Sequence, residues 1–64
     1  MNETMLARTT RTVTFIDKGN TIRMVRKPRN TFVWAKAQRD GTLRICVPQT
    51  LLEQTVYLSA VEPA

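Results

Sequence analysis

The chain has 64 residues, with ten Lys and Arg, five Asp and Glu, one Cys and no His. This length allows one small domain with a thin hydrophobic core. The absence of His and of paired cysteines excludes the common zinc-ligand sets and the usual general base near neutral pH, so we expect a binding protein that is not an enzyme and needs no metal or cofactor.

Apolar and polar residues show no periodicity over residues 1–10, which we expect to form a flexible N-terminal arm. Residues 11–62 are predicted to form a single small β domain. It begins with two alternating runs on either side of the turn-forming residues 17–20, and this pattern predicts a β-hairpin. With residues 17–20 as the loop, the face turned to the core carries Val13, Phe15, Ile22 and Met24.

A second hairpin is predicted after the break at Pro28, because two further alternating runs flank Asp40-Gly41. Asp-Gly favours a two-residue type I′ loop, which would pair Trp34 with Val47. The face predicted to enter the core then carries Phe32, Trp34, Leu43, Ile45 and Val47. The opposite face holds mostly small residues: Val33, Ala35, Ala37, Arg44 and Cys46.

Residues 48–55 begin with Pro48 and are expected to form one or two helical turns, and residues 56–61 resume the alternation of a final strand. This order of elements resembles that of small SH3-like barrels. The predicted fold class is therefore mainly all-β, either a small SH3-like barrel or a curled antiparallel sheet.

A second resemblance covers residues 41–52, with the sequence GTLRICVPQTLL. This run resembles the strand, proline and short helix at the centre of the AbrB/MazE antitoxin family. The resemblance implies an alternative fold, a swapped-hairpin dimer, and it implies DNA as the ligand.

All ten basic residues lie between positions 8 and 44, where Asp17 and Asp40 are the only acids. The positive electrostatic field of these residues attracts polyanions, and the guanidinium group of Arg suits bidentate contacts with phosphate. We therefore expect a small basic accessory or regulatory protein that binds nucleic acid, either DNA or RNA. The candidate phosphate-binding residues are Arg11, Arg23, Arg26, Lys27, Arg29 and Arg44.

Trp34 and Phe32 have two candidate roles, as a stacking platform for single-stranded bases with Lys36 and Arg29 nearby or as part of the core, and the predicted register favours the core. The alternative function is a protein-interaction module or a small inhibitor that docks on an acidic surface of a larger protein. Exposed edge strands or the small residues around Ala35, Ala37 and Cys46 would serve that function.

No run reaches the roughly 18 apolar residues of a membrane-spanning helix, so we expect no membrane partner and a cytoplasmic location. One cysteine cannot form an intramolecular disulfide, and a thin core needs support from elsewhere. Self-association into a homodimer is the remaining source of that support.

Overall fold

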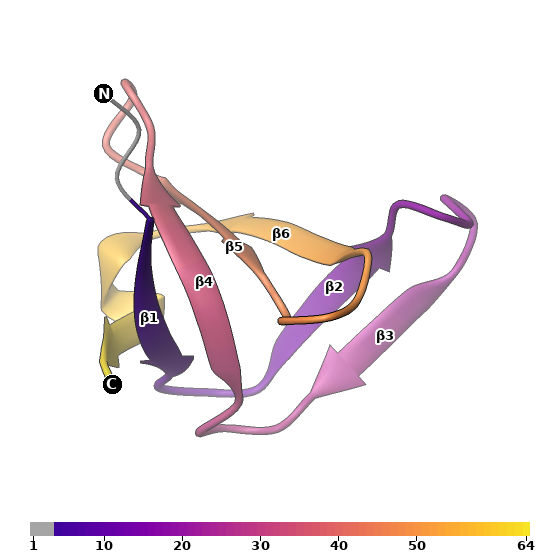
Figure 1. Ribbon diagram of the computed structural model, residues 1–64, viewed down its shortest axis with the longest axis horizontal. Helices are drawn as coiled ribbons and strands as arrows, with labels where there is room; N and C mark the ends of the chain where they lie inside the picture. Colours follow the sequence, from indigo (N-terminus) through magenta and orange to yellow (C-terminus); the bar gives the residue numbers. More distant parts are fainter. Residues whose placement is uncertain (1–3) are drawn as a thin grey trace.

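Antiparallel β-strands joined into a single sheet make up most of the computed structural model, which describes residues 4–64 (Figure 1). Their order across the sheet is β3-β2-β6-β5-β4-β1-β7. The strands are β1 (Thr4–Thr9), β2 (Val13–Asp17), β3 (Met24–Lys27), β4 (Phe32–Ala37), β5 (Leu43–Cys46), β6 (Leu52–Val56) and β7 (Val61–Pro63). The sheet curls around its inner face, which confirms the mainly all-β prediction of a curled antiparallel sheet.

A 3₁₀ turn, η1 (Leu58–Ala60), is the one helical element among the described residues. Within residues 4–64 we find no helix long and apolar enough to cross a membrane.

Strand β1 corrects the prediction of a flexible arm, because residues 4–9 lie inside the sheet between β4 and β7. Ala7 and Thr9 face the core and are buried, while Leu6 and Arg8 alternate with them on the opposite face. The inner residues of this strand are small or polar, so the sequence lacked the large apolar repeat that announces a strand. Residues 1–3 of the expected arm lie outside the described residues.

The first hairpin forms where it was predicted, but with a longer loop. Residues 18–23 connect β2 to β3 through two consecutive turns, in which the Asn20 amide donates to the Asp17 carbonyl at 2.9 Å and the Arg23 amide donates to the Asn20 carbonyl at 2.8 Å. The Asp17 amide donates to the Arg23 carbonyl at 3.1 Å, so residues 18–22, an odd number, lie between these two bonded residues. A loop with an odd number of residues shifts the pairing of the second strand by one residue relative to a loop with an even number. The side chains of the second strand then exchange faces of the sheet. Phe15 therefore pairs with Val25, and the prediction of Ile22 and Met24 in the core is wrong, since both are exposed.

The second hairpin also differs by one residue from the prediction. Its loop is residues 39–41, closed by the Gln38 amide donating to the Thr42 carbonyl at 2.9 Å, and Gly41 has φ +86°. This is the three-residue loop in which a glycine with positive φ ends the turn, in place of a two-residue type I′ loop. Trp34 pairs with Cys46 rather than with Val47.

This register reverses the predicted faces of β4. Val33 and Ala35 are buried at 0% and 3% exposure, whereas Phe32 and Trp34 are 55% and 42% exposed. Small side chains fit the narrow space enclosed by a curled sheet, and a Trp side chain does not. The core role predicted for Phe32 and Trp34 is wrong, and so is the outward small-residue face predicted around Ala35.

The segment after β5 contains no helix of the expected kind. Pro48 and Gln49 occupy the centre of a β-turn closed by the Thr50 amide on the Val47 carbonyl at 3.2 Å, and Gln49 has φ +64°. Proline followed by a residue with positive φ is the pattern of a type II turn. Strand β6 follows at Leu52, so this part of the chain departs from the strand, proline and short helix of the antitoxin family. The final strand predicted over residues 56–61 is replaced by η1 and β7.

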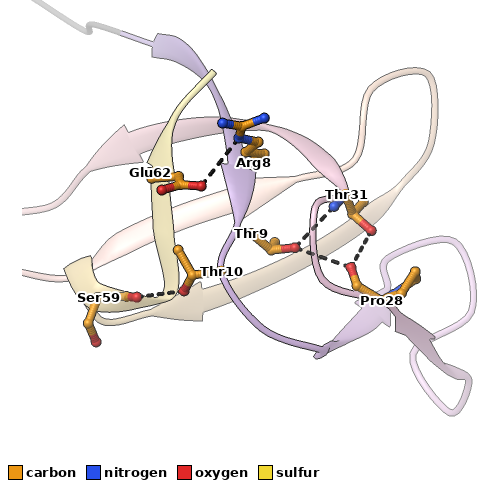
Figure 2. Close-up of polar contacts among 7 residues, drawn as sticks. All are labelled: Arg8, Thr9, Thr10, Pro28, Thr31, Ser59 and Glu62. Carbon is orange, nitrogen blue, oxygen red and sulfur yellow. Dashed lines mark hydrogen bonds and ion pairs between the residues drawn. The ribbon is translucent and has the colours of Figure 1, made fainter.

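The core lies inside the curl and is built from a single aromatic residue with mostly small aliphatic ones. Its buried apolar residues are Ala7, Val13, Phe15, Val33, Ala35, Ile45, Leu52, Val56 and Ala60. Thr9 is fully buried beside them, and its hydroxyl donates to the Pro28 carbonyl and accepts from the Thr31 amide, both at 3.2 Å (Figure 2). This corner fixes the end of β1 to the turn that precedes β4.

Candidate nucleic-acid interface

The outer face of the sheet carries the side chains that alternate with the core residues. Register pairs join six of them into one line across β3, β2, β6, β5, β4 and β1, which we call the outer row. Its members in that order are Met24, Ile16, Glu53, Cys46, Trp34 and Leu6. All of them except Glu53 are apolar or weakly polar, which is unusual for side chains that face away from a core.

Two aromatic residues form one end of this surface. Trp34 lies opposite Leu6, and Phe32 lies opposite Arg8 on the same pair of strands. Because Phe32 and Trp34 are two residues apart on β4, their side chains project from the same face about 7 Å apart. We call these two residues the aromatic platform.

Basic side chains flank the aromatic platform. Lys36 follows Trp34 on the outer face of β4 and lies opposite Arg44 on β5. Beyond them, at the β4–β5 hairpin, an open hollow of about 490 Å³ is lined by Lys36, Arg39 and Arg44 together with Ala37, Gln38 and Asp40. Three cations against one acid make this hollow electropositive.

Asp40, the acid at this hollow, is engaged by its own hairpin. Its Oδ1 accepts from the Thr42 hydroxyl at 2.6 Å and from the Thr42 amide at 3.0 Å. These bonds, the hydroxyl bond first, hold the pKa of Asp40 below its ordinary value. The carboxylate therefore shapes the turn through its Oδ1 atom.

The acids of the outer face are paired with cations at exposed positions. Glu53 lies 3.6 Å from Lys18 Nζ and 3.8 Å from Arg44 Nε, and Glu62 lies 3.3 Å from Arg8 Nε. Exposed ion pairs of this kind contribute little to stability, so their cations can exchange a carboxylate for a phosphate at small cost.

The structure distributes the six predicted phosphate-binding residues over several surfaces. Arg44 and Arg26 lie on the outer face, Arg26 opposite Thr14. Arg23 ends the β2–β3 loop and lies 3.7 Å from Asp17, whereas Lys27 pairs with Val13 and points to the inner side of β3. The remaining two lie in connections, Arg29 before β4 and Arg11 between β1 and β2. Within the predicted cluster over residues 23–29, the structure brings Arg23 and Lys27 together at an open hollow of about 210 Å³, while Arg26 lies on the opposite face of β3.

Sequence reasoning identified Phe32 and Lys36 as possible partners of Trp34 in a stacking platform but favoured the core for both aromatics, and it missed Arg8 and Arg39 beside them. The signal was present, because aromatic and basic residues alternate at positions 32, 34 and 36. Its use depended on the loop length, which decides which face of β4 points outward.

Among residues 4–64 there is no group of three or more Cys, Asp and Glu placed to hold a metal ion. Models of protein families, curated proteins and solved structures give no match to this chain.

Proposed function

We propose that this chain is a small basic nucleic-acid-binding protein of the accessory or regulatory kind, which binds single strands of DNA or RNA on the outer face around Trp34. The observation that carries the proposal is the aromatic platform, exposed beside Arg8, Lys36 and Arg44. Bases of a single strand stack on exposed aromatic rings while their phosphates contact basic side chains. In a duplex the ring faces of the bases are occupied by their neighbours, so single strands suit this surface.

Within this proposal the phosphate contacts come from Arg44, Arg8, Lys36 and Arg39, which surround the aromatic platform. Arg23, Arg26 and Lys27 lie on or beside the edge strand β3, away from β4 in the order of the sheet, and contribute to the general positive field, whereas Arg29 lies in the turn just before Phe32. The contacts position a strand without reading its sequence.

Trp34 supplies its own reporter because it is the only Trp in the chain. A ten-nucleotide single strand should quench its fluorescence, and the affinity should fall as salt is raised. Inorganic polyphosphate, which has the charge but no bases, should leave the fluorescence nearly unchanged. Absence of oligonucleotide binding at low salt, or equal quenching by polyphosphate, would sink the proposal.

Variants separate stacking from charge. Trp34→Ala should weaken binding of a labelled single strand by about 5- to 150-fold, the equivalent of about 1–3 kcal/mol for one stacked base. Met24→Ala is the matched control, since Met24 is an exposed apolar residue at the far end of the outer row. Lys36→Gln should lower the salt slope by about 0.7, whereas Lys27→Gln removes the same charge from the inner side of the edge strand β3 and should leave the slope unchanged.

A second candidate function, the protein-interaction module, is favoured by the other end of the outer row. Met24 and Ile16 are exposed there, and β3 is an edge strand of the sheet within the described residues. An edge strand beside exposed apolar side chains suits strand addition by a protein partner or a second copy. A partner retained from nuclease-treated lysate by the wild-type chain and by Trp34→Ala, but lost with Met24→Asp, would favour this function.

A further inference from the structure

A second exposed aromatic residue lies on the outer face at some distance from the aromatic platform. Tyr57 follows β6 directly, is 72% exposed and has extended backbone angles, φ −77° and ψ 160°. It therefore continues the alternation that places Glu53 and Thr55 on the outer face. No core contact explains a ring left this open to solvent.

Tyr57 lines an open hollow of about 290 Å³ together with Arg11, Thr42, Thr55 and Val56. The hollow thus combines a ring for stacking, a guanidinium group and two hydroxyl groups. The Thr42 hydroxyl already donates to Asp40, which leaves the Thr55 hydroxyl as the free donor among these two in the described part of the chain. A ring, a cation and a hydroxyl are the groups that bind a base and its phosphate.

The two aromatic sites are connected through Arg44. Trp34 lies opposite Cys46, so Arg44 is its diagonal neighbour on β5. Arg44 lies opposite Thr55, so Tyr57 is in turn the diagonal neighbour of Arg44 on β6. Diagonal neighbours on adjacent strands are about 7–8 Å apart, which places the Trp34 and Tyr57 positions about 15 Å apart with a cation midway.

We propose that Tyr57 and Arg11 form a second base-binding subsite for the same single strand. The nucleic-acid strand then crosses this part of the sheet diagonally, with one base on the aromatic platform, a phosphate at Arg44 and a later base on Tyr57. The β-strands that it crosses, β4, β5 and β6, are neighbours in that order (Figure 1). This inference rests on the proposed function and adds the path of the strand and a minimum length of ligand.

The test uses ligand length. A dinucleotide is too short to span about 15 Å, so it occupies the aromatic platform alone, whereas a ten-nucleotide strand reaches both subsites. Tyr57→Ala should weaken the ten-nucleotide strand at least fivefold and leave the dinucleotide unchanged, and Trp34→Ala should weaken both. Amide chemical shifts report binding in every variant, and the unbound spectrum shows that each variant is folded.

Controls identify the chemistry of the subsite. Leu58→Ala changes a neighbouring residue that is also exposed, at 62%, but does not line the hollow, and it should bind like the wild type. Tyr57→Phe keeps the ring and should keep the affinity. Arg11→Gln should lower the salt slope for the ten-nucleotide strand only.

The outcomes separate this inference from the proposed function. If Trp34→Ala weakens the ten-nucleotide strand and Tyr57→Ala does not, the second subsite is overturned and the proposed function stands. If Tyr57→Phe loses as much affinity as Tyr57→Ala, stacking on this ring is overturned. If the wild-type chain binds neither ligand, both proposals fail.

Discussion

Thr9 shows how a single hydroxyl substitutes for a missing ladder contact at a corner of the sheet. Its side chain is fully buried, and it bonds both the Pro28 carbonyl and the Thr31 amide (Figure 2). The Thr31 hydroxyl also donates to the Pro28 carbonyl, at 2.6 Å, so that oxygen keeps a partner without Thr9. The Thr31 amide is the group that depends on Thr9.

Replacement of Thr9 by Val should destabilise the fold by about 1–3 kcal/mol, because the shape is kept while a half-buried amide loses its partner. Urea unfolding of the two proteins measures this difference. Thr12→Val is the control, because it makes the same change at an exposed threonine, and it should change stability by less than about 0.5 kcal/mol. A Thr9→Val protein as stable as the wild type would show that the hydroxyl contacts are dispensable.

The acidic residues of the two hairpin turns make the short-range contacts that Asp favours in turns. Asp17 Oδ1 accepts from the Gly19 amide at 2.9 Å, and Asp40 accepts from Thr42. Both contacts span two residues, so local sequence alone was enough to foresee them.

At the scale of elements, the turn after β5 places strain on a residue that is not suited to it. Gln49 has φ +64° at the third position of a type II turn, where Gly is favoured because it has no Cβ. Asn30, at φ +71° before β4, is in a similar conformation, but Asn tolerates it.

Gln49→Gly should therefore stabilise the chain by about 0.5–1 kcal/mol, the relief of left-handed strain less the entropy cost of Gly. Asn30→Gly is the matched comparison and should change stability by less than about 0.5 kcal/mol. Thermal and urea unfolding measure both. Equal effects of the two substitutions would contradict the assignment of strain to Gln49.

The sequence was sufficient to locate both hairpins and insufficient to orient them. Turn residues at 17–20 and at Asp40-Gly41 mark the reversals correctly, but loop length decides which face of the second strand points inward. In β4 both faces are apolar, Phe32 and Trp34 on one and Val33 and Ala35 on the other, so the pattern could not choose between them. The narrow interior of the curled sheet accommodates Val33 and Ala35 better than the larger aromatic side chains, and this decides which face of β4 points inward.

The candidate site, too, was only partly predictable from the sequence. Trp34 as a stacking residue and Arg44 as a cation were both named from the sequence, and the structure places them one diagonal step apart. Their association with Arg8 was not predictable, because it requires β1 beside β4, and the sequence of β1 lacks the pattern of a strand.

At the scale of the whole molecule, neighbouring strands of the sheet are paired over stretches of different length. Strand β2 meets β6 over the pairs Ile16 with Glu53 and Asp17 with Leu52, and the Gln54 side chain adds a bond to the Thr14 carbonyl at 2.9 Å. The strands β1, β4, β5 and β6 are paired over longer stretches. The β2–β3 hairpin is thus attached to the rest of the sheet by the short ladder between β2 and β6 and by the burial of Phe15.

Amide hydrogen exchange should reflect this division. Amides of β4 and β5 should exchange slowest, and those of the edge strand β3 fastest among the strands that form hairpins, because local opening at the β2–β6 ladder exposes them. Heteronuclear NMR resolves them individually. Equal protection of β3 and β5 would mean that the β3 edge is covered, as it would be in the expected homodimer, and dilution of the sample would then restore fast exchange.

The position of β1 sets the order in which the fold can be completed. Both of its neighbours are distant along the chain, since Ala7 pairs with Val33 on one side and with Pro63 on the other. Hairpins close early because their partners are local, whereas pairings across most of the chain pay a large loop-closure entropy and form late. During synthesis β1 is therefore made before both of its partners, and its backbone groups depend on transient contacts until β4 and then β7 have followed it.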